Sequence, residues 1–249
     1  MNYVGESTKK KLDAAQVKEL LAKGKIDVEE LVPWGSNYTF LVTVRDAGRE
    51  ALAVYKPSRG ERPLWDFPDG TLAFREVAAF LVSNALGWPN VPFTLLRDGP
   101  QGLGMVQEYI EMVDHQHFFT LRDKHREEMK RIAAFDAIIN NTDRKGGHIL
   151  LGTDGKIWCI DHGVTFHEQP KLRTVVWDYV DQSIPREVLS GLETLREQLR
   201  RNDPLCEALS RLLSPREMKA LRARIDELIS TGVFPKPPED WPPVPWPPV

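Results

Sequence analysis

Hydrophobic and polar residues alternate in short runs through the first hundred residues of this chain, which is the pattern of half-buried strands. The predicted strands are residues 38–44, 51–55, 91–97 and 103–109, separated in pairs by polar turns. A short helix is predicted at residues 13–24, and a second one from residue 72 or 73 to Leu86, where Gly87 ends it. Residues 58–70 show no period, so we predict a long loop there.

From residue 121 onward the spacing of apolar residues becomes helical. Helices are predicted at residues 124–140, 186–201, 204–213 and 215–230. Two apolar runs, at residues 149–151 and 157–160, predict a short hairpin after the first of these helices. We therefore predict an α+β fold with two lobes, a small strand-rich N-terminal lobe at about residues 25–109 and a helical C-terminal lobe at about residues 110–233.

The end of the chain follows neither pattern. Residues 234–249 hold eight prolines, with Trp241 and Trp246 among them. Proline has no backbone N–H and breaks helices, so this tail is predicted to be extended or disordered. Such a tail would suit docking into an aromatic-lined groove of a protein partner.

Composition and charge argue against several classes of protein, including nucleic-acid-binding, disulfide-rich and membrane-spanning proteins. The formal net charge is −3 and the basic residues are scattered among acids, which does not indicate a nucleic-acid partner. Cys159 and Cys206 show no CxxC spacing, so neither a disulfide framework nor a zinc site is indicated. No apolar run approaches the ~18 residues that span a bilayer, and the N-terminus lacks the apolar core of a signal peptide. We therefore expect a cytoplasmic protein without a transmembrane segment.

The strongest functional signal is a polar segment placed between two apolar runs. Asn140-Asn141-Thr142-Asp143-Arg144 follows the predicted helix, and Asp161-His162-Gly163 follows the second strand of the hairpin. Two acids placed in this way can converge. Phosphoryl transfer needs such a pair, because one carboxylate orients the attacking hydroxyl and the other holds the metal that neutralises the triphosphate. A hairpin with surface acids at its ends is the simpler alternative.

These segments resemble the phosphatidylinositol 3- and 4-kinase family of the protein-kinase-like superfamily, especially the type II phosphatidylinositol 4-kinases and small bacterial members. Members carry Asp-Arg in the catalytic loop, often after Asn-Thr, and a metal-binding Asp followed by Gly after the hairpin. The resemblance covers about residues 35–178. It implies that Asp143 is the catalytic acid, that Arg144 adds positive charge beside the transferring phosphoryl group, and that Asp161 is the principal metal ligand.

The same resemblance implies an ATP site and a divalent metal, Mg or Mn. Lys56 would pair with the α- and β-phosphates and Glu76 would hold that lysine. Ser36 and Asn37 would lie in the phosphate-covering loop, and Glu108 and Tyr109 at the hinge whose backbone contacts adenine. The acceptor hydroxyl stays open among a protein Ser or Thr, a small soluble alcohol and an inositol lipid.

One position departs from the family pattern. An Asn stands five residues after the catalytic Asp in the family, whereas this chain has His148. Imidazole favours manganese, iron or zinc over magnesium. His148 would thus bind the metal through nitrogen, contact the triphosphate, or mark a reduced metal site with slow or absent activity. A metallohydrolase cluster with His162 and His167 is a further alternative, although the spacing matches no known zinc motif.

Two other functions are compatible with the same residues. The chain could be a nucleotide-binding regulatory module, a pseudokinase, that acts on a partner without catalysis. It could also transfer AMP instead of phosphate, if the nucleotide binds in the reverse orientation.

Overall fold

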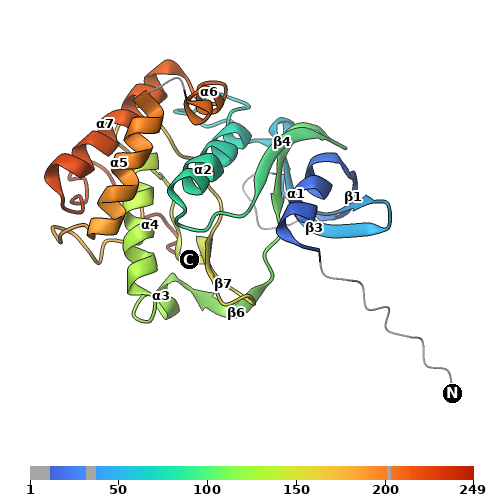
Figure 1. Cartoon of the computed structure of the whole chain (residues 1–249), viewed down its shortest axis with the longest axis horizontal. Coiled ribbons are helices and arrows are strands. Elements are labelled where there is room, and N and C mark those ends of the chain that lie inside the picture. Colours follow the sequence, from blue (N-terminus) through green and yellow to red (C-terminus); the bar gives the residue numbers. More distant parts are fainter. Residues whose placement is uncertain (1–11, 32–37, 201–202) are drawn as a thin grey trace.

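The computed structural model describes residues 12–31, 38–200 and 203–249. Its N-terminal part is built on an antiparallel five-stranded sheet with the order β1-β2-β3-β5-β4 (Figure 1). The strands are β1 (Lys25–Leu31), β2 (Phe40–Asp46), β3 (Arg49–Pro57), β4 (Thr94–Gly99) and β5 (Gly102–Glu108). Four of them were predicted from alternation. β1 was not, because only Ile26 of its seven residues is buried and the strand has no apolar face to reveal it.

Helix α1 (Ala14–Lys23) closes one face of this sheet. Its Leu20 and Leu21 are fully buried against inward-facing strand residues such as Val42 and Tyr55. Asp13 caps the helix, since its side chain accepts a hydrogen bond from the Gln16 N–H. The small N-terminal lobe therefore has a core of its own.

Helix α2 (Leu72–Leu86) lies between the sheet and the helical part (Figure 1). Ala73 and Val77 pack with Met105 of β5, whereas Ala78 and Val82 belong to the core of the helical lobe. Gly87 ends the helix in the left-handed conformation, with φ of 74°, which glycine adopts without strain. The position of α2 makes it the structural link between the two lobes.

The C-terminal lobe is mainly helical and shares one large apolar core. A small sheet with the order β6-β7-β8 faces it. The elements are β6 (Met112–His117), α3 (Phe118–Leu121), α4 (Arg126–Ile139), β7 (Ile149–Gly152), β8 (Ile157–Cys159), α5 (Arg186–Arg200), α6 (Pro204–Ser210) and α7 (Pro215–Thr231). The α+β fold with a strand-rich first part and a helical second part is thus confirmed. None of the helices in the described ranges is long and apolar enough to cross a membrane.

The proline-rich tail packs on its own chain. It contains no helix or strand, but the Thr174 N–H donates to the Pro243 carbonyl at 2.9 Å and the Gly146 N–H to the Pro248 carbonyl at 2.7 Å. The indole N–H of Trp177 also donates to the Pro243 carbonyl, at 3.0 Å. Trp246 is 85% exposed. Much of the tail therefore forms part of the C-terminal lobe surface, and Trp246 is its most exposed aromatic side chain.

Arg75 joins α2 to α7 through a buried ion pair. Its guanidinium, 2% exposed, donates to Glu217 Oε1 at 2.5 Å and to the Thr165 carbonyl at 2.7 Å. We expect Arg75→Met to lower the free energy of unfolding by about 2 kcal/mol, because it leaves these acceptors without their donor. Denaturant unfolding measures this, with Arg122→Met as the control, since the Arg122–Asp178 pair is partly exposed. Equal stability of the two variants would contradict a linking role for Arg75.

Candidate active site

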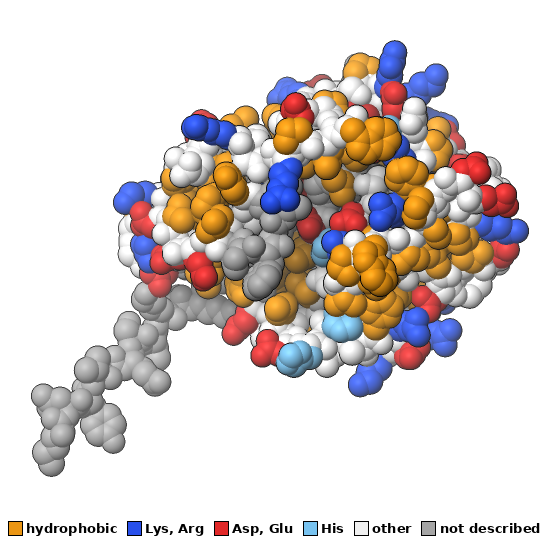
Figure 2. All heavy atoms as spheres, turned by 180° about the vertical axis from the view of Figure 1, so that it is seen from behind, with side chains coloured by type: hydrophobic (Ala, Val, Ile, Leu, Met, Phe, Trp, Pro, Cys, Tyr) orange, Lys and Arg blue, Asp and Glu red, His pale blue; other side chains and the backbone are white. Residues whose placement is uncertain are grey.

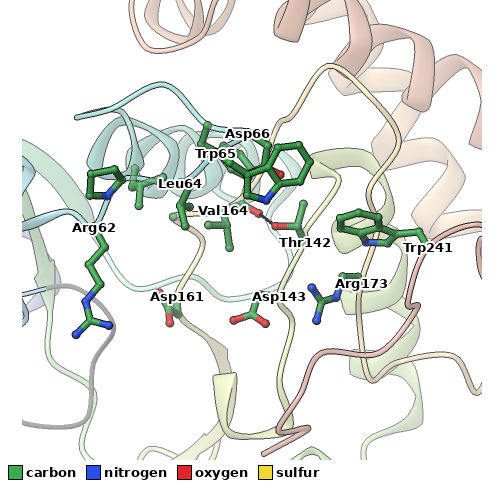
Figure 3. Close-up of a pocket in the computed structure, with 14 residues that line it drawn as sticks. Arg62, Leu64, Trp65, Asp66, Thr142, Asp143, Asp161, Val164, Arg173 and Trp241 are labelled. Atoms are coloured by element: carbon green, nitrogen blue, oxygen red, sulfur yellow. Dashed lines mark hydrogen bonds between the residues drawn. The ribbon is translucent and has the colours of Figure 1, made fainter.

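Two acids from separate segments meet at one cavity. Asp143 follows α4 after a left-handed residue, Asn140, with φ of 52°, and Asp161 follows β8 with φ of 61°. Both line a cavity of about 480 Å³ (Figure 3). Left-handed backbone is uncommon outside glycine and often marks functional sites. Figure 2 shows this side of the molecule, where hydrophobic side chains surround a hollow that holds acidic and histidine side chains.

The loop that carries Asp143 is held by its own polar side chains. The Asp143 N–H donates to Asn141 Oδ1 at 3.0 Å, and the Thr142 hydroxyl donates to the Val164 carbonyl at 2.9 Å (Figure 3). Burial raises the pKa of the Asp143 carboxyl, and the nearby Lys145 and Arg173 oppose that shift. Lys145 Nζ lies 3.5 Å from Asp143 Oδ2. A carboxylate with a raised pKa is better suited to accept a proton than an ordinary surface acid.

Lys56 connects the N-terminal sheet to the second acid. Its Nζ lies 2.7 Å from Glu76 Oε1 and 2.8 Å from Asp161 Oδ1. The other Glu76 oxygen, Oε2, accepts the His162 N–H at 2.9 Å. Attraction by Lys56 holds the pKa of Asp161 far below its usual value, so Asp161 is ionised at neutral pH. The lysine and glutamate that the sequence analysis paired are therefore paired in the structure, with Asp161 as a third member.

Arg144 lies elsewhere than expected. It is fully buried, and its Nη2 donates to Asp136 Oδ1 at 2.9 Å while Nη1 donates to the Ile160 carbonyl at 2.9 Å. Its Nη2 is also 2.8 Å from His162 Nε2. The guanidinium therefore lies behind the site and ties the end of α4 to the end of β8. It is fully buried and does not line the cavity, so it cannot contact a phosphoryl group there, although its charge still acts on Asp161.

His148 lies beside Asp161, with 3.4 Å between Nε2 and Asp161 Oδ2. Burial lowers its pKa to about 4, so the imidazole is neutral at pH 7. The Lys145 N–H points at Nδ1 at 3.4 Å, an arrangement that leaves the ring proton on Nε2, facing Asp161. A histidine must be neutral to bind a metal, and His148 meets that condition. The ring proton would also have to move from Nε2 to Nδ1, so that the Nε2 lone pair could bind the metal.

The donor set suits a metal that is bound only partly by protein. In the described part of the chain, no cluster of three or more His, Cys, Asp or Glu residues forms a ready-made metal site. Asp143 and Asp161 offer carboxylate oxygens to the same cavity. Magnesium commonly takes one or two carboxylates and completes its shell with water and phosphate oxygens, so these residues fit it.

The metallohydrolase alternative finds no support in the histidine positions. His162 is fully buried against Arg144, and the same burial lowers its pKa well below the usual value. His167 Nε2 lies 3.0 Å from the Asp66 carbonyl, and its Nδ1 accepts the Gln169 N–H. Each of these rings is thus held by a different local contact.

The nucleotide residues predicted from the first lobe are only partly placed. Ser36 and Asn37 lie outside the described residues. Glu108 ends β5, and its N–H already donates to the Phe93 carbonyl at 2.9 Å; the Tyr109 N–H donates to the Leu52 carbonyl at 3.2 Å. These two N–H groups already have backbone partners, and a contact of this segment with adenine stays a prediction.

Most of the residues that line the cavity were not predicted as site residues, among them large polar and aromatic side chains. Trp65 comes from the loop at residues 62–67, Arg173 from the segment after Asp161, and Trp241 from the tail (Figure 3). They lie far apart in sequence and in no recognisable motif. The only sequence features that indicated a functional role for these segments were the unusual length of the 58–70 loop and the tryptophans of the tail.

Comparison with known proteins identifies relatives of this chain. Residues 85–223 match the sequence model of the phosphatidylinositol 3- and 4-kinase family. The chain is 39% identical over 262 aligned positions to protein Rv2133c of Mycobacterium tuberculosis (strain H37Rv), covering 90% of this chain and 94% of that protein.

Two solved structures resemble this chain at low sequence identity. One is the structure of hydra Fam20 with sugar, whose sequence is 14% identical to this chain; the alignment covers 87% of each chain with a TM-score of 0.53. The Helicobacter pylori proinflammatory kinase CtkA is 13% identical, with a TM-score of 0.47 and coverage of 85% of this chain and 93% of that one. Together with the family match, the shared fold confirms the predicted kinase-like architecture.

Proposed function

Because this chain belongs to the phosphatidylinositol 3- and 4-kinase family, we propose that it transfers the γ-phosphate of ATP to an alcohol. The observation that carries the proposal is the placement of Asp143 and Asp161 on one cavity, with Asp161 joined to Lys56 and Glu76. An isolated surface acid would not need a buried lysine–glutamate pair behind it. This arrangement supports a kinase over a hairpin with surface acids.

In this proposal each residue has a separate task. Asp143 accepts a hydrogen bond from the acceptor hydroxyl and takes its proton as the new oxygen–phosphorus bond forms. The bond between the γ-phosphorus and the β,γ-bridging oxygen breaks, and ADP leaves with the bonding electron pair. Lys56, held by Glu76, pairs with the α- and β-phosphates, and its ion pair with Asp161 loosens when they bind.

Asp161 is the residue that would hold a divalent metal, with His148 3.4 Å away from it. When bound, the metal neutralises the triphosphate and the charge that develops during transfer. His148 contacts Asp161 from the side, so we assign it to the same site as a residue that orients Asp161 or shares the metal. A nucleotide-binding module without turnover is the second candidate, and the replacement of the usual Asn by His148 favours it.

His148 provides the test of the metal site. We expect His148→Asn to raise ATP turnover with magnesium relative to manganese, because an amide oxygen suits magnesium better than imidazole nitrogen. Turnover is measured by ADP release from wild type, His148→Asn and Asp161→Asn in each metal. Loss of turnover in Asp161→Asn, with a changed metal preference in His148→Asn, supports the kinase. Wild-type ATP binding without ADP release in either metal would instead favour the regulatory module.

A further inference from the structure

The cavity in front of Asp143 extends beyond the groups that handle the nucleotide. Lys56 and Glu76 border a separate, smaller recess, which shares Asp161 with the cavity. The larger space, about 480 Å³, is walled by Trp65, Arg173 and Trp241 (Figure 3). Its volume lies in the range of small-molecule sites. We propose that it binds the acceptor, and that the acceptor is a small alcohol carrying a phosphate or carboxylate group; this inference rests on the proposed function.

Arg173 is held firmly beside the catalytic loop. Its backbone N–H donates to the Asn141 carbonyl at 2.8 Å, and its carbonyl accepts the Arg144 N–H at 3.0 Å. The next residue, Thr174, is fixed by the tail at Pro243 and by a hydroxyl bond to Asp136 at 3.1 Å. The backbone thus fixes the origin of the Arg173 side chain relative to Asp143, as pre-organised binding requires.

The guanidinium of Arg173 lies near the Asp143 carboxylate, which it attracts without contact, and near the Trp241 ring. This guanidinium makes no hydrogen bond or ion pair with any residue in the described ranges, and its Nε is buried without a partner. The carboxylates around it have other cations beside them: Asp66 pairs with Lys171 at 2.5 Å, Asp161 pairs with Lys56, and Asp143 lies 3.5 Å from Lys145. A partly buried guanidinium of this kind favours an anion, because carboxylate and phosphate match its planar donors.

Two indole rings give the cavity apolar walls. The ammonium of Lys171 lies 4.3 Å from the centroid of Trp65 and 5.4 Å from that of Trp241, so both rings lie next to the same cation. Trp65 is 84% exposed. The guanidinium of Arg173 lies 6.0 Å from the Trp241 centroid. The cavity thus combines apolar rings with the guanidinium of Arg173 and the carboxylate of Asp143. These groups suit a small ligand that has a hydrocarbon part, one anionic group and one hydroxyl.

These positions assign an orientation to the acceptor. Its anionic group lies against Arg173, its carbon skeleton against Trp241 and Trp65, and its hydroxyl toward Asp143. A neutral sugar would leave Arg173 unpaired, whereas a protein segment would have to enter past the tail that Pro243 and Pro248 anchor. The tail therefore acts as part of the acceptor site in this account.

The experiment is a binding titration of the full chain with four probes, in the presence of a non-hydrolysable ATP analogue. Glycerol phosphate and glycerate are compared with uncharged glycerol, and phosphatidylglycerol vesicles present a glycerol phosphodiester on a bilayer. Tryptophan emission reports binding, since two indoles line the cavity. The variants are Arg173→Gln, Arg173→Lys and Trp241→Phe. Arg131→Gln is the matched control, because Arg131 on α4 pairs with Glu187 on α5 and neither residue lines the cavity.

We expect at least one free anionic probe to bind about tenfold or more tightly than glycerol, and Arg173→Gln to remove that advantage. Arg173→Lys should restore part of it, with the affinity for the ATP analogue and the unfolding temperature unchanged. Equal binding of charged and neutral probes, binding of vesicles alone, or an equal loss of ATP affinity in Arg173→Gln would each overturn the proposal. Binding is measured without turnover, so failure of this site is distinguishable from failure of the kinase activity.

Discussion

Asp143→Asn is expected to lower the rate of ATP turnover by about 10²- to 10⁴-fold, the range that general acid–base groups contribute. The amide keeps the size of the side chain and can still accept the Lys145 contact, but it cannot take up the acceptor proton. ATP affinity should change little, because Lys56, Glu76 and Asp161 are untouched. The measurement is steady-state ADP release together with calorimetric ATP binding.

Asp114→Asn is the matched control for that substitution. Asp114 lies on the exposed face of β6, away from the cavity residues, so the same chemical change should leave turnover as in wild type. If Asp143→Asn and Asp114→Asn turn over ATP equally well, Asp143 takes no part in the reaction.

Arg144→Met should cause the largest loss of stability, about 3–5 kcal/mol in the free energy of unfolding. Asp136 and Arg144 are both fully buried. Asp136 also accepts hydrogen bonds from Asn141 Nδ2 and Thr174 Oγ1 at 3.1 Å each. Removing the guanidinium leaves this carboxylate buried with two neutral donors, and denaturant unfolding measures the cost.

The partner residue supplies a second variant for the same question. Adding Asp136→Leu to Arg144→Met should recover part of the lost stability, since no buried charge is then left unpaired. Arg216→Met, at a side chain that is 83% exposed, should stay within about 0.5 kcal/mol of wild type. An Arg144→Met variant with wild-type stability but no ATP turnover would return Arg144 to a direct role in the reaction.

The helices and strands that could be predicted from the sequence are those with one regular face in the core and the other in solvent. β2, β3 and α2 bury regular apolar faces, so their spacing identifies them. β1 and β6 are largely exposed and polar, and they exist because a neighbouring strand supplies hydrogen bonds, which no local pattern encodes.

Some residues of the site can be predicted from their neighbours in the sequence, and others cannot. Asp143 and Asp161 are signalled by polar residues next to buried runs, and Lys56 by its position at a strand end. The adjacent Arg144 carries the same signal, yet its side chain turns into the core toward Asp136. Arg173 is placed by backbone hydrogen bonds to Asn141 and Arg144, about 30 residues earlier in the chain. Trp241 reaches the cavity because the tail folds back over the C-terminal lobe, a contact between segments about 70 residues apart.

The most direct test of the central claim is the identity of the nucleotide product. Wild type and Asp143→Asn are incubated with ATP and magnesium or manganese, and the products are separated by chromatography and mass spectrometry. We expect ADP from wild type, with release from Asp143→Asn at least about 10²-fold slower. AMP with pyrophosphate, or ADP formed no faster by wild type than by Asp143→Asn, would contradict γ-phosphate transfer at this site.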